Sequence, residues 1–314
     1  MRSTGIIGTA KNTGKTTTLN WLMKRAGSES IAVTGIGYDG EERDNITMLP
    51  KPRISFEKGV IIATAEKCLL SARAKCVVIS KTGVITSLGE VMIARITEPG
   101  LLVIAGPNRA SDLKPVMQYI EATGVESLLV DGSLNRMSPM YLMDELIFAT
   151  GGARSRDIVQ LASEMKHAEK LFCFPLNSLG INQLCEVKSL YSPEDAAEIP
   201  RDERSLYISS FFSEKALYHL IQKREIAELV FHSPLQILIA CGLDRAEIFL
   251  STVIQAGVNV SYIHRPELRM VTVNPFYPVE KDYRYSAGYL DRDELLRVMQ
   301  GEVNVEVKDV VGEG

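Results

Sequence analysis

Residues Gly8 to Thr16 read Gly-Thr-Ala-Lys-Asn-Thr-Gly-Lys-Thr, which fits the pattern G-x-x-x-x-G-K-[ST] of a phosphate-binding loop (P-loop). The apolar stretch Thr4–Ile7 comes before this loop, and a helical pattern over Thr16–Arg25 comes after it. Strand, glycine loop and helix form the context in which the pattern binds phosphate, because the helix N-terminus carries a partial positive charge. The alternative, a glycine turn that only starts a helix, explains fewer of these features.

The loop assigns a role to most of its residues. We expect Lys15 to reach the β- and γ-phosphates of a nucleotide and the hydroxyl of Thr16 to ligate Mg²⁺. Backbone N–H groups along the loop form an anion-binding nest. The predicted nucleotide-binding residues are therefore Gly8, Lys11, Asn12, Thr13, Gly14, Lys15, Thr16 and Thr17.

A phosphate-binding loop needs acidic partners that hold Mg²⁺ and orient water. Asp131 ends the apolar run Ser127–Val130, and the carboxyl ends of strands are where α/β sheets bind ligands. Asp39 and Glu41 lie in a charged loop that follows the predicted strand Ile31–Gly37. We predict Lys15, Asp39 and Asp131 as catalytic residues, and Thr16, Asp39, Glu41 and Asp131 as metal ligands. A turn aspartate at 131 and a solvated charged loop at 39–44 are the plainer alternatives.

Further candidates remain open. Lys11 lies four residues before Lys15, whereas the extra lysine that some dimeric ATPases extend to a partner's nucleotide lies five before, so Lys11 equally fits a solvated lysine or one that contacts phosphate in its own chain. Arg109 and Arg136 follow predicted strands and match phosphate chemically, although a surface position is the default for arginine. The loop Asn177–Gln183 offers amides for a nucleotide base, and Thr272–Pro278 is a candidate partner-binding loop.

Composition limits the function classes. The formal net charge of −4 argues against nucleic acid as a partner. No apolar run approaches the roughly 20 residues of a membrane span, and the N-terminus leads directly into the first predicted strand, which leaves no signal peptide. The five cysteines form no C-x-x-C pair. We therefore expect a cytoplasmic protein without membrane or nucleic-acid partners.

Strand and helix patterns alternate along the first half of the chain, which predicts an α/β fold with a doubly wound, mainly parallel sheet of the P-loop NTPase type. The predicted strands are Thr4–Ile7, Ile31–Gly37, Gly59–Ala63, Cys76–Ser80, Val91–Ile96, Leu101–Ala105, Ser127–Val130 and Lys170–Phe174. A turn signal at residues 97–100 suggests that Val91–Ile96 and Leu101–Ala105 form a hairpin.

The second half repeats the α/β pattern without a second phosphate-binding loop. Its predicted strands include Ser205–Ser210, Gln236–Ala240 and Asn259–His264. The polar stretch at 191–204 reads as a linker or surface loop. We predict a nucleotide-binding domain over residues 1–175, a linker over 176–204 and a smaller C-terminal α/β domain over 205–314.

Four strings together resemble one family. They are GTAKNTGKTTTLN (residues 8–20), GYDGEERD with LPKPRI (37–44 and 49–54), LLVDGSLNR (128–136) and VTVNPFYP (271–278). They resemble the P-loop subunit of the reactivating factor for lysine 5,6-aminomutase, a coenzyme-B12-dependent radical enzyme. The resemblance spans most of the chain, with YDGE (residues 38–41) and LPKPR (residues 49–53) its more specific parts.

The resemblance implies an ATPase that uses ATP and Mg²⁺ to drive release of damaged cobalamin from the aminomutase. It implies a second reactivase subunit and the aminomutase as partners, and the sequence is compatible with a homo-oligomer. No D-x-H-x-x-G string is present, so the chain is not expected to bind cobalamin itself. ATP is favoured over GTP because the sequence contains no N-K-x-D string. The alternative is an ATP-dependent biosynthetic ligase or small-molecule kinase of the dethiobiotin-synthetase-like type.

Overall fold

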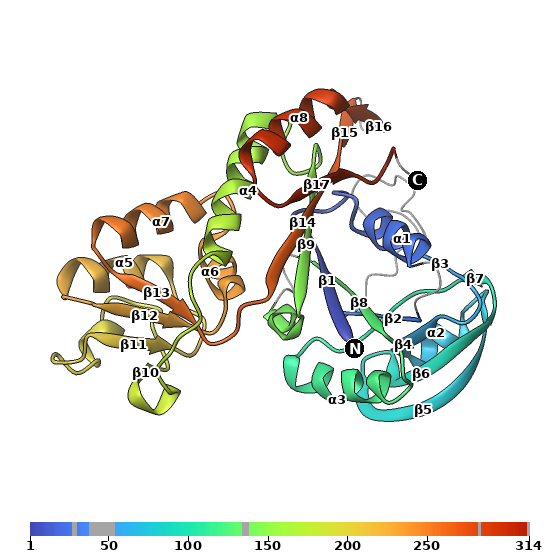
Figure 1. Cartoon of the computed structure of the whole chain (residues 1–314), viewed down its shortest axis with the longest axis horizontal. Helices are drawn as coiled ribbons and strands as arrows, with labels where there is room; N and C mark the ends of the chain where they lie inside the picture. The colour runs from blue at the N-terminus through green and yellow to red at the C-terminus, as the bar shows by residue number, and fades with distance from the viewer. Residues whose placement is uncertain (27–29, 38–53, 134–137, 282–283, 313–314) are drawn as a thin grey trace. The chain divides into compact units, whose positions relative to one another are not determined.

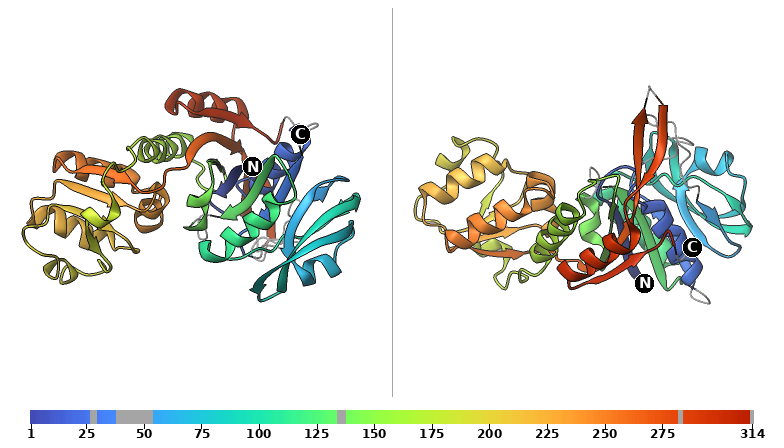
Figure 2. Two further views of the ribbon diagram at one scale, coloured as in Figure 1. Left: turned by 60° about the horizontal axis from the view of Figure 1, so that its bottom comes forward. Right: turned by 90° about the horizontal axis from the view of Figure 1, so that it is seen from above.

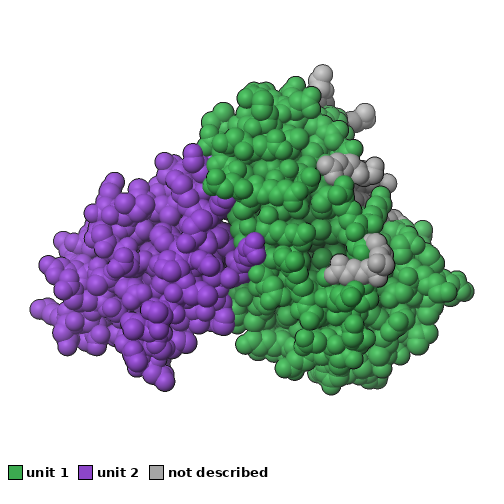
Figure 3. All heavy atoms as spheres, viewed as in Figure 1, with its two compact units in different colours: residues 1–161, 268–314 green, residues 162–267 purple. Residues whose placement is uncertain are grey.

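The computed structural model describes residues 1–26, 30–37, 54–133, 138–281 and 284–312. Its described part divides into two compact units, residues 1–161 with 268–314 and residues 162–267, which Figure 3 shows in green and purple. Both units alternate helices and strands, so the predicted α/β class is confirmed. No helix among the described residues is long and apolar enough to span a membrane.

The first unit contains a mixed, largely parallel sheet of nine strands, called the large sheet below (Figure 1). In spatial order its strands are β17 (Glu306–Asp309), β14 (Glu267–Asn274), β9 (Glu145–Gly151), β1 (Arg2–Gly8), β8 (Ser127–Ser133), β2 (Ile31–Gly35), β4 (Ile61–Ala65), β6 (Gly89–Glu98) and β5 (Lys75–Thr86). Parallel pairing joins β9 to β1, β1 to β8, β8 to β2, and β2 to β4. Parallel neighbours bring their carboxyl ends to one edge of the sheet, which is where β1 delivers the glycine loop.

The central strands are buried on both faces, as their apolar sequences require. Every residue of β9 and β2 is buried, and in β1 only Arg2 is exposed. Helix α1 (Lys15–Arg25) covers one face through Leu19, which packs in a cluster with Ile6 and Leu129. The other helices of this unit are α2 (Glu66–Leu70), α3 (Ala110–Glu121) and α8 (Arg292–Glu302).

The antiparallel part of the large sheet differs from the predicted hairpin. Strand β6 contains the predicted Val91–Ile96 but pairs with β5 and β4, both antiparallel. In the predicted strand Leu101–Ala105, only Leu101 belongs to a strand, β7 (Gly100–Leu101), which pairs with β3 (Ser55–Phe56). The hairpin prediction is therefore wrong: the long strand Lys75–Thr86 supplies the hairpin partner through the two-residue turn Ser87–Leu88, and Gly89, which begins β6, adopts the positive φ of +103° that such a tight turn favours.

The second unit contains a smaller parallel sheet in the order β10 (Cys185–Val187), β11 (Ser205–Ile208), β12 (Glu228–Phe231) and β13 (Asn259–Tyr262). Helices α5 (Glu214–Lys223), α6 (Pro234–Cys241) and α7 (Ala246–Gln255) connect its strands. Helix α4 (Ile158–Phe172) begins in the N-terminal segment of the first unit, which ends at Leu161, and its remaining residues belong to the second unit.

Two predicted strands are helical. Lys170–Phe174 mostly belongs to α4, which continues through Phe172, and Gln236–Ala240 lies within α6. Helix α6 begins with Ser233 as N-cap and Pro234 in its first turn, both strong start signals, and a short apolar run does not by itself distinguish a strand from a buried helix.

The division of the chain also corrects the predicted domains. Residues 268–314 belong to the first unit, not to a C-terminal domain over 205–314. Strand β14 enters the large sheet next to β9, and β17 pairs with β14 in parallel at the sheet edge. The interval 176–204, predicted as a linker, contains strand β10 of the small sheet.

Beyond β14, the chain forms a separate two-stranded ribbon from β15 (Phe276–Lys281) and β16 (Arg284–Tyr289). The right-hand view of Figure 2 shows this ribbon extending away from the large sheet. The ribbon starts two residues after Asn274, the last residue of β14, which places its base beside the carboxyl end of the sheet.

Candidate functional site

The loop between β1 and α1 has the backbone geometry of a tight anion-binding turn. Gly14 adopts φ +93° and Asn12 φ +65°, a left-handed region that glycine and asparagine tolerate best. The Thr13 hydroxyl donates to the Ala10 carbonyl at 3.0 Å, which closes the loop on itself. A methyl group at Gly8 would lie 3.2 Å from Thr13 Oγ1, so a larger residue there would press on the loop.

The start of α1 leaves backbone donors available at this loop. Its N-cap is Gly14, which has no side chain to cap the helix, and its first turn contains no acidic residue. In the described part of the chain, the N–H groups of Thr16 and Thr17 find no acceptor. Unsatisfied N–H groups and the helix dipole together favour an anion at this position.

A lysine and an aspartate meet beside the loop. Lys15 Nζ lies 3.3 Å from Asp131 Oδ1, and their side chains are only 14% and 11% exposed. Asp131 lies in β8 opposite Ile6 of β1, so direct pairing of these strands positions the carboxylate. The structure therefore brings together two of the three predicted catalytic residues.

The donor set at the loop fits Mg²⁺ bound together with phosphate. Magnesium is usually held by one or two carboxylates, with phosphate oxygens and water completing its shell. Asp131 supplies a carboxylate and the half-buried Thr16, in the first turn of α1, a hydroxyl. No group of three or more His, Cys, Asp or Glu residues that could hold a metal exists among the described residues, so a fully protein-bound metal is not supported in that part of the chain.

Other predicted residues lie outside this arrangement. Asp39, Glu41 and Arg136 fall outside the described residues, so their predicted roles stay predictions. Lys11 is exposed, as a solvated loop lysine would be. Arg109 is also exposed and occupies the N-cap position of α3, where its side chain makes no capping hydrogen bond.

The loop Asn177–Gln183 belongs to the second unit. The amide of Asn177 donates to Glu228 Oε1 at 3.0 Å and to Ser261 Oγ at 3.1 Å. These contacts engage the amide hydrogens of Asn177 within its own unit, and a contact of the other amides of the loop, Asn182 and Gln183, with a nucleotide base stays a prediction.

The structure adds residues from β14 that sequence reasoning did not connect to the loop. Thr272 Oγ1 lies 2.7 Å from Thr18 Oγ1 of helix α1. Asn274 Nδ2 donates to the carbonyl of Asn12, within the loop, at 3.1 Å. The sequence marked residues 272–278 as an unusual loop, but more than 250 residues separate it from the glycine loop, and no local pattern reveals the contact.

Comparison with known proteins identifies no relative, because no family model, no curated protein and no solved structure matches the chain.

Proposed function

We propose that this protein binds Mg²⁺ and ATP at the loop Gly8–Thr16 and hydrolyses the nucleotide, as a P-loop NTPase. The observation that carries the proposal is the Lys15–Asp131 pair beside a loop with left-handed glycine and asparagine residues. A cation for phosphate and a carboxylate for metal are the two charged groups that phosphoryl transfer requires of the protein.

The chain's own residues divide the work in this proposal. The N–H groups of the loop and of the first turn of α1 hold phosphate oxygens, and Lys15 offsets the charge that accumulates during transfer. Asp131 and Thr16 hold the metal ion, which when bound neutralises negative charge on the β- and γ-phosphates. The proposal also includes Asp39 and Glu41, whose role in orienting the attacking water is predicted from the sequence alone.

The narrower role rests on the sequence resemblance. In that proposal the chain is the ATPase subunit of a cytoplasmic reactivating factor, and ATP binding and hydrolysis drive release of damaged cobalamin from lysine 5,6-aminomutase. A nucleotide can shift the aminomutase between closed and cofactor-releasing states only if the ATP-bound and ADP-bound forms of this chain bind those two states with different affinities.

The site proposal is tested with Asp131→Asn, which preserves side-chain shape and removes the charge next to Lys15. ATP turnover should fall strongly and should require more Mg²⁺ for half-maximal rate, while some nucleotide binding persists. Asp144→Asn is the matched control, because Asp144 accepts hydrogen bonds from Ser3 at the other end of β1. Unchanged turnover at limiting Mg²⁺ in Asp131→Asn would remove Asp131 from the metal site.

The partner proposal is tested with an aminomutase that holds an inert cobalamin. Activity should return only when this chain, a second reactivase subunit, ATP, Mg²⁺ and fresh adenosylcobalamin are all present. If ATP is hydrolysed but activity does not return and the complex does not respond to nucleotide, the reactivase role is wrong. Turnover that requires an added small-molecule acceptor would instead favour a ligase or kinase.

A further inference from the structure

The end of β14 lies directly on the glycine loop. Asn274 is only 8% exposed, and its Nδ2 donates to the Asn12 carbonyl at 3.1 Å. A methyl group added to Gly14 would lie 3.1 Å from Asn274 Cβ, so the asparagine side chain packs against the turn that starts α1. The loop and the end of β14 are therefore in direct contact.

The opposite end of the same amide holds the start of the ribbon. Asn274 Oδ1 accepts from the backbone N–H of Phe276, the first residue of β15, at 3.1 Å. Both polar ends of the side chain are thus engaged, one with the loop and one with the ribbon. Asn274 is accordingly suited to connect the two elements and not to read a nucleotide base.

The backbone of Asn274 is fixed independently of its side chain. Gly152 N–H donates to the Asn274 carbonyl at 3.0 Å. A Cβ on Gly151, which has φ +149°, would come within 1.9 Å of the same carbonyl oxygen, so only glycine permits this approach. Because the backbone is anchored at the end of β9, loss of the side chain removes the connection without releasing the strand.

The ribbon is attached to the rest of its unit at its base. Among the residues that the structure describes, strands β15 and β16 pair only with each other, from Phe276 opposite Tyr289 to Lys281 opposite Arg284. The described contacts at its base include the Arg156 guanidinium over the Tyr277 ring at 4.7 Å, and the Leu290 N–H to Pro275 carbonyl bond at 2.9 Å joins the two chain segments that flank the ribbon. Isolated two-stranded ribbons are marginally stable, so a single added or lost contact at the base changes how often the ribbon opens.

We infer that Asn274 is a positioning residue that couples the glycine loop to the β15–β16 ribbon, so that nucleotide in the loop changes how firmly the ribbon is held. The inference rests on the proposed nucleotide site. Phosphate fixes the loop backbone and with it the Asn12 carbonyl. The Asn274 side chain then holds the Phe276 N–H in place. By linkage, a ribbon that is held more firmly also favours nucleotide binding.

The test is hydrogen–deuterium exchange of the full chain with and without Mg²⁺ and a non-hydrolysable ATP analogue. In the wild-type protein, exchange should slow in the loop and in β15 and β16, by at least about threefold in the ribbon. In Asn274→Ala, the loop should still respond and the ribbon should not. Asn274→Asp keeps the acceptor for Phe276 but not the donor to Asn12, and it should uncouple the ribbon equally, which guards against loss of folding in the alanine variant.

Ser286→Ala is the control, because it removes a contact inside the ribbon and leaves Asn274 in place. Its ribbon should still respond to the analogue. A wild-type loop that responds while the ribbon does not would overturn the coupling and leave the nucleotide site intact. A ribbon that responds equally in Asn274→Ala would show that another path carries the effect. No response in the loop would overturn both the coupling and the proposed site.

Discussion

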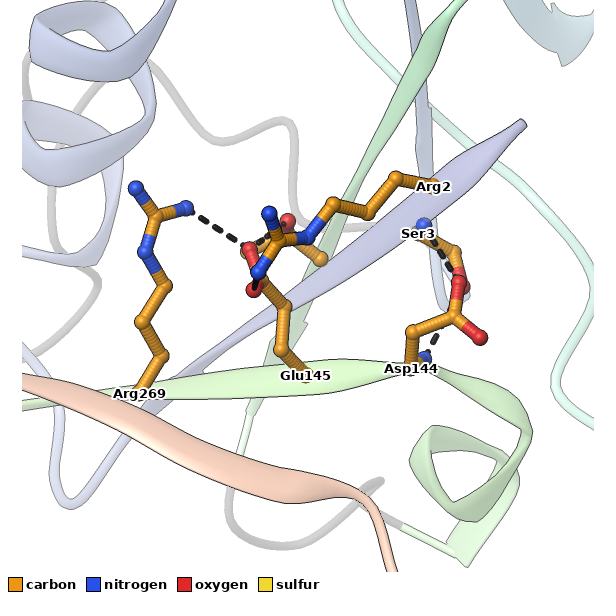
Figure 4. A network of polar contacts seen from close by, with 6 residues as sticks. Arg2, Ser3, Asp144, Glu145 and Arg269 are labelled. Atoms are coloured by element: carbon orange, nitrogen blue, oxygen red, sulfur yellow. Dashed lines mark hydrogen bonds and ion pairs between the residues drawn. The ribbon is translucent and has the colours of Figure 1, made fainter.

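Replacing Glu145 by Gln tests how the returning strand β14 is attached to the large sheet. Glu145 begins β9 and is only 1% exposed, and its carboxylate faces the guanidinium groups of Arg2 and Arg269 (Figure 4). Its carboxylate accepts from Thr4 Oγ1 at 2.6 Å, from Arg269 of β14 at 2.7 Å and from Arg2 of β1. The Glu145 side chain therefore connects three neighbouring strands, β1, β9 and β14. In the sequence, the residues of the second unit lie between β9 and β14.

The expected loss in the free energy of unfolding depends on how deeply the Glu145 carboxylate and its two arginine partners are buried. Removing one partner of a fully buried ion pair lowers the stability of the fold by about 3–5 kcal/mol, because the other charge stays buried without a partner and without solvation by water. Here the arginine side chains are 62% and 40% exposed, so water can solvate them after the change. The glutamine also places an amide N–H₂ group against the guanidinium donors. We expect a loss of about 2–3 kcal/mol.

The assay is urea unfolding followed by tryptophan fluorescence. Trp21 is the only tryptophan of the chain, and it packs with Ile147 of β9 and Met270 of β14, so it reports on the strands that Glu145 joins. With a slope of about 2–3 kcal/mol/M, the unfolding midpoint should fall by about 1 M.

Glu98→Gln is the matched control, because Glu98 pairs with Lys75 on the surface of the same sheet, where the side chains are 60% and 70% exposed. It should cost less than about 1 kcal/mol. In the double variant of Glu145 and Arg269, the losses should be less than additive. If Glu145→Gln shifts the midpoint no more than Glu98→Gln does, the network does not attach β14 and the reasoning is refuted.

Two further predictions concern backbone fit and thiol reactivity. Gly151→Ala should destabilise the first unit by about 2 kcal/mol or more in the same assay, because the added Cβ would meet the carbonyl oxygen of Asn274. Gly301→Ala is the control and should be neutral or stabilising, because open space surrounds Gly301. Equal unfolding midpoints for the two variants would contradict the close approach of β14 to Gly151. Burial, with a smaller contribution from the nearby Glu214, raises the pKa of Cys241 to about 12, so at pH 8 only about one thiol in ten thousand is ionised. Alkylation at pH 8 should therefore modify the exposed Cys173 and spare Cys241, and rapid modification of both in folded protein would show that α6 is not packed as described.

The glycine loop and its aspartate were predictable because their signals are local. A fixed spacing of glycines and lysine encodes the turn between β1 and α1, and an apolar run that ends in an acid places Asp131 near the carboxyl end of β8, two residues before the strand ends at Ser133. Sequence periodicity was ambiguous for Gln236–Ala240, because α6 is apolar at nearly every position, including the exposed Ile239, and so lacks the polar face that would have marked a helix.

The contribution of residues 268–314 to the first unit was not predictable from local patterns. The sequence also predicts a strand at Met270–Val273, which lies within β14, but strand propensity does not say which sheet a strand joins. The choice depends on contacts between distant residues, such as Arg269 with Glu145 and Thr272 with Thr18. Strand β9, which receives β14, was not among the predicted strands, so the neighbour that would have indicated this pairing was missing.

The measurement that tests the central claim most directly compares ATP turnover by the wild-type protein and Lys15→Ala in the presence of Mg²⁺, with Lys24→Ala as the control at the other end of α1. Lys15 is the first residue of α1 and pairs with Asp131, whereas Lys24 is exposed in the last turn of the same helix. The account predicts a loss of about 100-fold or more in Lys15→Ala, with folding retained, and no loss in Lys24→Ala. Wild-type turnover in Lys15→Ala, or a wild-type protein that neither binds nor hydrolyses Mg²⁺–ATP, would contradict the assignment of this loop as the active site.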